Sequence, residues 1–376
     1  MSRVRVNHSV VKTSEEMIDL EAGDPYLHTP ENVREAGKKA IDEGYTHYLR
    51  PPETLQLREA VAKMLKFEAG INVDSDGVRI MAGGLNAIFS SMVRLIDPGD
   101  EVLMPNPNFP RFEEFTRICR GVPVFYHLLE KDGWRPDVTE IERKINPKTK
   151  ILVIITPNNP TGGVIDIDDL RAIAEAVVEN DIYVIADEMY YKMVYPPNKH
   201  ISIASLKGME DKTVTIGGLT KAYSMCGWRI AWVASHNTEL VEKIDFWKPH
   251  TVCSISQMAA LEALLGSQKF VEDSRLLWMR HRDIAYKRLT EIGFECFLAQ
   301  GGFYLFPNHS MFIDDSNKFI KYMREVAKVK LASGIYYGRN GYFRFGFTCQ
   351  PIQTMEEGLN RIEKAIKKLE NKNQLK

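Results

Sequence analysis

The chain lacks several features that would assign it to a particular class of protein. Its longest strongly apolar run, Ile151 to Ile155, is far shorter than the about 20 residues of a membrane span. Its 49 Lys and Arg residues are balanced by 50 Asp and Glu residues, so no overall positive charge attracts nucleic acid or an anionic membrane. The first residues hold no apolar segment before their acidic residues, which argues against a signal peptide. A length of 376 residues predicts about two domains. We expect the protein to be cytoplasmic.

Cysteine and histidine are too scattered to indicate disulfides or a metal site. The five cysteines include no CxxC pair, which favours buried thiols in a reducing compartment. The nine histidines include no HExxH motif, and no cysteine–histidine cluster has the spacing of a zinc site. No GxGxxG follows a strand-like run, and no GxSxG is present. The sequence therefore predicts no bound metal and no dinucleotide or serine-hydrolase chemistry.

Short β-rich runs alternate with longer helical patterns in the middle of the chain. The expected strands are Val78–Ala82, Glu101–Met104, Val122–Tyr126, Ile151–Thr156, Ile182–Asp187, Thr213–Ile216 and Ile230–Ala234. The expected helices include Leu55–Glu68, Ala87–Ile96, Phe112–Arg120 and Asp169–Glu179. Nearly continuous apolar strands are typical of a parallel sheet that is buried on both faces. The pattern predicts a large α/β domain over residues 40–267, with a mainly parallel seven-stranded sheet flanked by helices.

The last hundred residues have a different pattern. A helical stretch from Gln268 to Glu291 precedes two short strand-like segments, Gly302–Phe306 and Tyr342–Phe347. The closing helix carries apolar residues at spacings of three and four, namely Leu359, Ile362, Ile366 and Leu369. This pattern predicts a smaller α+β domain over residues 268–376. Its lysine-rich end is interpreted as a solvated helix face.

Three polar motifs follow predicted strands. The first is PNNPTG at 157–162, whose prolines hold Asn159 in an extended conformation. The alternative is a turn that ends a strand and binds nothing. The second is ADEMY at 186–190, in which Asp187 follows four apolar positions and needs a partner. That partner is either a helix end or buried cation of the protein, or a protonated ligand nitrogen close to Tyr190.

The third motif is GGLTK at 217–221, followed by GWR at 227–229. A desolvated lysine beside other cations has a lowered pKa and becomes an amine nucleophile, although Lys221 alone could equally be an exposed loop residue. The carboxyl ends of parallel strands form one crevice, so we expect the three motifs to meet. Together they are the groups that pyridoxal phosphate requires.

The order of NNPTG, DExY and TK-x7-R resembles the fold type I pyridoxal-phosphate enzymes, specifically the class I/II aminotransferases such as aspartate aminotransferase. The resemblance runs from about Asp19 to the closing helix. It implies that residues 1–39 join 268–376 in the small domain. It also implies amino-acid metabolism, with ping-pong transfer of an amino group between an L-amino acid and a 2-oxo acid.

The resemblance assigns roles to the residues of the three motifs. Lys221 matches the lysine that forms the Schiff base with the cofactor and carries the proton. Asp187 matches the partner of the pyridine nitrogen. Tyr190 and Asn159 match the groups on the ring oxygen, and Arg229 matches the phosphate arginine. The resemblance also implies that the Asn159–Pro160 bond is cis.

Further cofactor contacts are implied outside these motifs. The segment GGLNA at 83–87 matches the phosphate loop, where Gly84, Leu85 and Asn86 would face the phosphate. Thr220 would add a hydroxyl contact, and Phe109 matches the aromatic residue that stacks on the pyridine ring. Leu85 departs from the small or polar residue that is usual at its position.

The substrate and partner residues are also implied by the resemblance. Arg344 matches the arginine that binds the substrate α-carboxylate, with Asn159 and the backbone of Gly23 beside it. Tyr48 matches the tyrosine that reaches the phosphate of a neighbouring subunit, so we expect a homodimer with composite sites. Side-chain specificity would come from residues near Tyr26, Tyr336, Tyr337 and Arg339. They suggest an apolar or aromatic substrate, or a distal carboxylate paired with Arg339.

Two alternatives remain at this point. A lyase, racemase or synthase can use the same fold and cofactor, because a fold does not determine a reaction. A non-enzymatic sensor could bind the cofactor to regulate a partner. The complete set of Lys221, Asp187 and Arg344 favours the enzyme.

Overall fold

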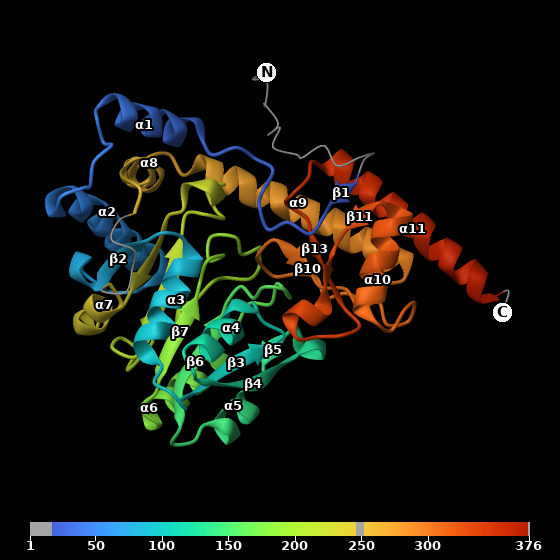
Figure 1. Ribbon diagram of the computed structural model, residues 1–376, viewed down its shortest axis with the longest axis horizontal. Helices are drawn as coiled ribbons and strands as arrows, with labels where there is room; N and C mark the ends of the chain where they lie inside the picture. Colours follow the sequence, from blue (N-terminus) through green and yellow to red (C-terminus); the bar gives the residue numbers. More distant parts are fainter. Residues whose placement is uncertain (1–16, 246–251, 375–376) are drawn as a thin grey trace.

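A computed structural model of the chain describes residues 17–245 and 252–374 (Figure 1). The N-terminal residues considered for a signal peptide lie almost wholly outside these ranges. The large sheet contains β2 (Val78–Met81), β3 (Glu101–Asn106), β4 (Val122–Leu129), β5 (Arg135–Pro136), β6 (Thr149–Ile155), β7 (Tyr183–Asp187), β8 (Thr213–Gly218) and β9 (Ala231–Ala234). Its strand order is β2-β9-β8-β7-β6-β3-β4-β5.

The sheet is mainly parallel, as predicted. Strands β4, β3, β6, β7 and β8 pair in parallel, whereas β9 runs antiparallel to both β8 and β2. All seven predicted strands are present. The prediction of seven is short by one, because β5 adds a two-residue antiparallel pairing to β4. Two residues are too few to show the alternation from which a strand is predicted.

Both faces of the sheet are buried, and the alternation along β6 shows how. Ile151, Val153 and Ile155 enter one apolar core, while Leu152 and Ile154 enter a second core. Helices cover the two faces (Figure 1). They include α2 (Pro51–Met64), α3 (Gly84–Leu95), α4 (Arg111–Ile118), α5 (Val138–Lys144), α6 (Ile167–Glu179) and α7 (Thr238–Asp245). Helix α1 (Glu31–Asp42) packs on α8 (Ser254–Leu265).

Local sequence explains two of the helices that border the strand ends. Helix α3 begins at Gly84, directly after Gly83 with φ of 88°, and buries a stripe that includes Ile88, Met92 and Leu95. Helix α6 begins after Asp166, whose side chain accepts hydrogen bonds from backbone N–H groups of the first turn. Both helices therefore start from loops that follow the carboxyl ends of strands.

The C-terminal part is a smaller α+β unit, which appears in orange and red in Figure 1. Its elements are α9 (Lys269–Ile292), β10 (Tyr304–Leu305), α10 (Ser316–Tyr322), β11 (Val329–Lys330), β12 (Ala332–Ser333), β13 (Phe343–Gly346) and α11 (Ile352–Gln374). Strand β13 lies antiparallel between β10 and β12. Strand β1 (Ile18–Asp19) pairs with β11, which joins the start of the described chain to this unit.

The division into 40–267 and 1–39 with 268–376 stays a prediction. Its first boundary runs through α1, and α1 packs on α8 rather than on the C-terminal strands. A Cβ atom at Gly37 of α1 would overlap Trp228 and contact Ala259, both of which belong to the range 40–267.

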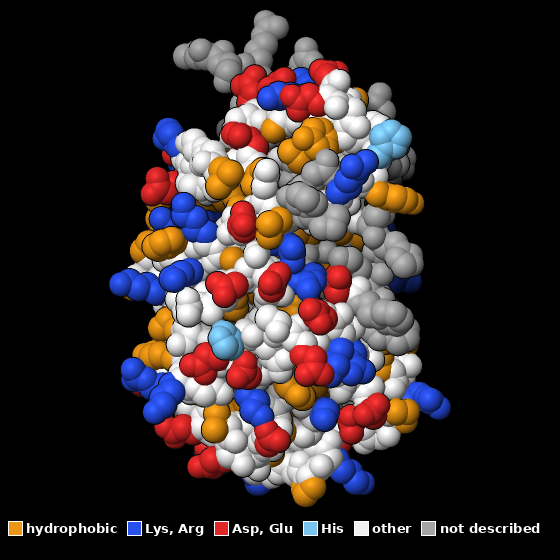
Figure 2. Space-filling view, turned by 90° about the vertical axis from the view of Figure 1, so that its left-hand side faces the viewer, with side chains coloured by type: hydrophobic (Ala, Val, Ile, Leu, Met, Phe, Trp, Pro, Cys, Tyr) orange, Lys and Arg blue, Asp and Glu red, His pale blue; other side chains and the backbone are white. Residues whose placement is uncertain are grey.

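The described residues, 17–245 and 252–374, show no sign of a helical membrane span, because none of their helices is both long and apolar enough to cross a membrane. Acidic and basic side chains are interspersed over the face shown in Figure 2. All five cysteines are free thiols.

Candidate active site

A cavity of about 400 Å³ lies at the carboxyl ends of β6, β7 and β8. Most of the residues predicted for the site line it. The lining residues are Gly23, Asp24, Gly84, Leu85, Ile88, Phe109, Asn159, Asp187, Met189, Tyr190, Thr220, Lys221, Cys226, Arg229, Tyr304 and Arg344. The three polar motifs therefore meet at one place, as expected from the strand order.

Asp187 ends strand β7, is buried and lines the cavity. Burial raises the pKa of its carboxyl group to about 6, and Glu188 adds to this effect while Lys221 opposes it. One carboxylate oxygen accepts a 3.1 Å hydrogen bond from the backbone N–H of Met189. A carboxylate in this environment is stabilised by a cation placed beside it.

Lys221 follows strand β8 and brings an amine to the same cavity. Its Nζ donates a 2.6 Å hydrogen bond to the carbonyl oxygen of Gly23 and lies 5.7 Å from the centroid of the Tyr190 ring. The Tyr190 hydroxyl group is buried, and burial raises its pKa well above the usual value. A neutral phenol and a primary amine thus lie close together.

The end of the cavity at the start of α3 suits an anion. Helix α3 starts there with Gly83 and Gly84, and the N-terminus of a helix favours negative charge. A Cβ atom at Gly83 would overlap the guanidinium group of Arg229, so only glycine allows this close approach. Arg229 has a left-handed backbone with φ of 57°, and its Nη1 donates to the carbonyl oxygen of Cys226. Thr220 also lines the cavity, and its hydroxyl donates a 3.4 Å hydrogen bond to the carbonyl oxygen of Ile230.

Arg344 reaches the cavity from β13 of the smaller unit. Its Nη1 donates a 2.9 Å hydrogen bond to Oδ1 of Asn159, and its Nη2 donates 2.8 Å to the carbonyl oxygen of Glu21. Its buried Nε has no hydrogen-bond partner within the described ranges. The Asn159–Pro160 bond is cis, as the resemblance implied. A buried, oriented guanidinium group of this kind can bind a planar carboxylate in two places.

Two predicted site residues do not line the cavity of their own chain. Oδ1 of Asn86 accepts a hydrogen bond from the backbone N–H of Ala82, so its side chain is used at the end of β2. Tyr48 is 79% exposed and precedes α2. The suggested specificity residues Tyr26, Tyr336, Tyr337 and Arg339 are also absent from the lining. The Arg339 guanidinium group instead lies 5.4 Å from the centroid of the Tyr342 ring.

Several lining residues were missed from the sequence, and Tyr304 and Met189 are the most informative. Met189 contacts Gly84, with its Sδ 3.3 Å from the position that a Cβ would take there. Tyr304 lies in the predicted strand Gly302–Phe306, where its apolar and aromatic neighbours are typical of residues in a hydrophobic core. Its hydroxyl group could have indicated a place in a polar site, because a buried tyrosine hydroxyl needs a hydrogen-bond partner.

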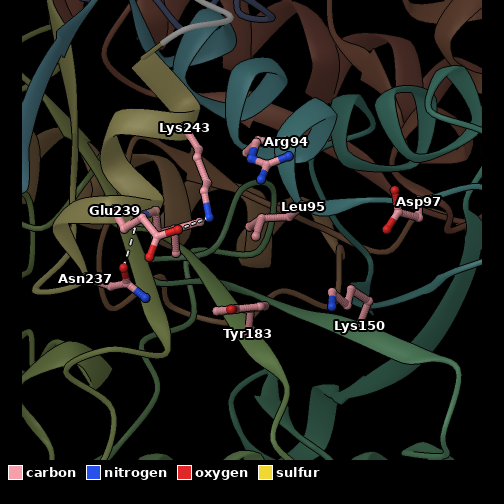
Figure 3. Close-up of a pocket in the computed structure, with 9 residues that line it drawn as sticks. Arg94, Leu95, Asp97, Lys150, Tyr183, Asn237, Glu239 and Lys243 are labelled. Carbon is pink, nitrogen blue, oxygen red and sulfur yellow. Dashed lines mark hydrogen bonds and ion pairs between the residues drawn. The ribbon is translucent and has the colours of Figure 1, made fainter.

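A second pocket of about 240 Å³ lies at the other end of the strands (Figure 3). Lys150 of β6 and Tyr183 of β7 line it near the start of their strands, together with Glu239 and Lys243 of α7, which contact each other. It shares no residue with the first cavity. Basic and acidic side chains both line it, so it does not select a ligand of one charge.

Strand ends that bring an asparagine, an aspartate and a lysine to one cavity define the class of fold type I pyridoxal-phosphate enzymes. The chain belongs to the aminotransferase class I and II family, which matches residues 15–362. It is a pyridoxal-phosphate-dependent aminotransferase, which resolves the choice between transaminase, lyase and sensor.

Relatives of this family are similar over nearly their whole length. The chain is 34% identical to aromatic-amino-acid aminotransferase 2 of Thermococcus litoralis, covering 97% of this chain and 96% of that one. It is 33% identical to aspartate aminotransferase of Pyrococcus abyssi, with the same coverage. Its fold matches the aromatic aminotransferase from Pyrococcus horikoshii with a TM-score of 0.89 at 34% identity, covering 94% of this chain and 96% of that one.

The residues present fit pyridoxal phosphate. The cavity offers a buried carboxylate for a ring cation, a lysine amine beside it, and an anion end built from a helix start and an arginine. The close approach of Arg229 to Gly83, which a methyl group would prevent, shows that the anion end depends on backbone as well as charge.

Proposed function

We propose that this aminotransferase uses Asp187, Lys221 and Arg344 as its central groups, in a ping-pong exchange between an L-amino acid and a 2-oxo acid. The observation that carries the proposal is that these three residues, from β7, the loop after β8 and β13, line one cavity. When bound, the cofactor supplies a ring that accepts electrons from the substrate Cα.

Each group of the cofactor site has a task that follows from its chemistry. Asp187 keeps a proton on the ring nitrogen, because its buried carboxylate is stabilised by a cation. Nζ of Lys221 would hold the cofactor covalently, and the same amine would serve as the base that takes the proton from the substrate Cα. Tyr190 and Asn159 would donate hydrogen bonds to the ring oxygen, and Phe109 would stack on the ring.

The phosphate would lie at the start of α3. Arg229, Thr220 and the backbone of Gly84 and Leu85 would bind it, because charge and backbone N–H groups point to the same end of the cavity. Arg344 would bind the substrate α-carboxylate, and Asn159 and Gly23 would fix its orientation. Holding the carboxylate sets the direction of the Cα–H bond, and such positioning lowers the barrier to proton transfer.

The rest of the cavity favours an amino acid with an apolar or aromatic side chain. Lys221, Arg229 and Arg344 are the cations among the described lining residues, and each already has a proposed task. The remaining side chains are mostly apolar, including Leu85 and Ile88, and Asp24 is exposed at the edge. An acidic residue at that place opposes a distal carboxylate.

The working protein is proposed to be a cytoplasmic homodimer. Tyr48 is exposed and lies outside the cavity of its own chain, which is what a residue that serves the neighbouring subunit requires. Its hydroxyl would reach the phosphate of that subunit. Free thiols at all five cysteines suit a reducing compartment.

Absorbance spectroscopy tests the proposal. Purified protein with pyridoxal phosphate should show a visible band, and phenylalanine or leucine should convert it to the pyridoxamine form. Conversion by aspartate alone would contradict the substrate class. Release of ammonia and an oxo acid without an amino acceptor would contradict amino transfer. Absence of a visible band would contradict the proposal that Lys221 binds the cofactor covalently.

A further inference from the structure

Tyr304 is a buried tyrosine of β10 that contacts both halves of the proposed site. It is 2% exposed, yet it lines the cavity. Strand β10 pairs with β13, in the register Tyr304 with Gly346, which brings the ring beside Arg344. The proposed roles given above do not use this residue.

The ring of Tyr304 supports the guanidinium group of Arg344. Cζ of Arg344 lies 3.9 Å from the centroid of the Tyr304 ring and 4.8 Å from that of Tyr337. A guanidinium plane against an aromatic face is attracted by the ring and loses rotational freedom. The Tyr304 ring therefore helps to orient the guanidinium group of Arg344, together with its hydrogen bonds to Asn159 and Glu21.

The hydroxyl group of Tyr304 contacts a different part of the site. Its oxygen lies 3.1 Å from the hydroxyl oxygen of Tyr190, and the two rings meet edge to face at 75°. It also lies so close to the α-carbon of Gly23 that a Cβ there would overlap it. The carbonyl oxygen of Gly23 accepts the hydrogen bond from Lys221. The Tyr304 hydroxyl is thus held between the hydroxyl of Tyr190 and the backbone of Gly23, to which Lys221 donates.

We propose that Tyr304 is a positioning residue with two separable tasks, an inference that rests on the proposed function. Its ring holds Arg344 for the substrate carboxylate. In the structure the Tyr190 hydroxyl donates to the oxygen of Tyr304. When Tyr190 donates to the cofactor ring oxygen instead, the Tyr304 hydroxyl would donate to Tyr190 across the same contact, and a hydroxyl that accepts such a bond becomes a better donor to that ring oxygen. Stabilising negative charge on that oxygen lowers the pH at which the visible band titrates.

Two variants separate the tasks. Tyr304→Phe keeps the ring and removes the hydroxyl, so the midpoint of the absorbance titration should rise by about 0.3–1 pH unit. KM for the amino donor should stay within about twofold, because the ring contact with Arg344 remains. Tyr304→Leu removes both parts and should also raise KM by about 5- to 30-fold.

Tyr126→Phe is the matched control, because Tyr126 is a buried tyrosine whose hydroxyl donates to the carbonyl oxygen of Val153 away from the cavity. It should change neither the midpoint nor KM. Tyr304→Phe retains the volume of the ring, so it tests the hydroxyl even if Tyr304→Leu does not fold.

The outcomes distinguish this inference from the proposed function. An unchanged midpoint in Tyr304→Phe would overturn the hydroxyl task. Equal KM values in Tyr304→Phe and Tyr304→Leu would overturn the ring task. A wild-type protein without a visible band would instead overturn the proposed function, before either variant is measured.

Discussion

The amine of Lys221 donates a 2.6 Å hydrogen bond to the carbonyl oxygen of Gly23, which lies 198 residues away in the sequence. Lys221 follows a strand of the large sheet, whereas Gly23 follows β1, which pairs with the C-terminal unit. The hydrogen bond therefore connects the two parts of the chain across the cavity. The backbone at Gly23 has little room, because the Tyr304 hydroxyl lies where a Cβ would be.

Gly23→Ala should destabilise the protein and lower its activity, because the new Cβ would overlap the Tyr304 hydroxyl. Overpacking of this kind costs about 1–3 kcal/mol in the free energy of unfolding. Adding Tyr304→Phe should recover part of the loss, since the Cβ would then face the ring carbon at 3.3 Å. Denaturant unfolding of the single and double variants measures this. Strict additivity of the two changes would contradict the contact.

Lys221→Ala should lose the visible band and lower turnover by about 10³-fold or more, because no other amine lines the described cavity. Turnover and spectra with added pyridoxal phosphate measure the effect. Lys207→Ala, at an exposed lysine outside the cavity, is the matched control and should behave like the wild type. Equal losses in both variants would point to general destabilisation.

Asp187→Asn should stabilise the cofactor-free protein while weakening cofactor binding. Since the folded-state pKa of Asp187 is raised from 3.8 to about 6, its contribution favours folding at low pH and is lost as the pH rises through this window. Ionisation then costs about 3 kcal/mol at pH 7.5. Unfolding of the cofactor-free proteins should show the variant more stable at pH 7.5, with a gap that narrows toward pH 4. A gap independent of pH would contradict this explanation.

Mixing two defective variants tests whether Tyr48 serves the neighbouring subunit. Lys221→Ala removes the amine of its own site, and Tyr48→Phe removes the phosphate contact of the partner's site. In a mixed dimer, one site would then carry both defects and the other none. After random subunit exchange at equal amounts, about one quarter of all sites should be intact. Activity at limiting cofactor measures them, and no recovery would indicate that Tyr48 acts within its own chain.

Arg344→Lys should raise KM for every amino donor by about 10-fold or more, because an ammonium group cannot reproduce planar two-point binding. Arg339→Lys is the matched control, since Arg339 lies against Tyr342 outside the cavity. Steady-state kinetics with phenylalanine and aspartate compare the two. A selective loss of aspartate activity in the Arg339 variant would restore the distal-carboxylate hypothesis.

The large sheet could be predicted because its strands are apolar on both faces, as in β6. Helix α1 was not predicted, because its buried residues include only one large apolar side chain, Val33, beside Gly37 and Ala40. Strand β5 was missed because it has two residues. A helix that packs through small residues, or a strand of two residues, shows little of the apolar periodicity from which such elements are predicted.

The polar site residues could be predicted better than the aromatic ones. Asn159, Asp187 and Lys221 are polar residues at the ends of apolar strands, and that contrast is visible in sequence. Tyr304 stands between Phe303 and Leu305, where an aromatic residue is indistinguishable from core. Its importance arises from pairing with β13, which the sequence alone does not place.

The segment 21–23 supplies two carbonyl oxygens to two cationic side chains, from Glu21 to Arg344 and from Gly23 to Lys221. Both contacts are made by backbone, so they depend on the number of residues and hardly on the side chains of Glu21 and Ala22. Both carbonyl contacts should therefore survive substitutions at 21 and 22, and the limit at 22 is the packing of Ala22 against the apolar core. A single insertion or deletion there would shift both carbonyl groups at once, and lineages that acquired one should have lost activity.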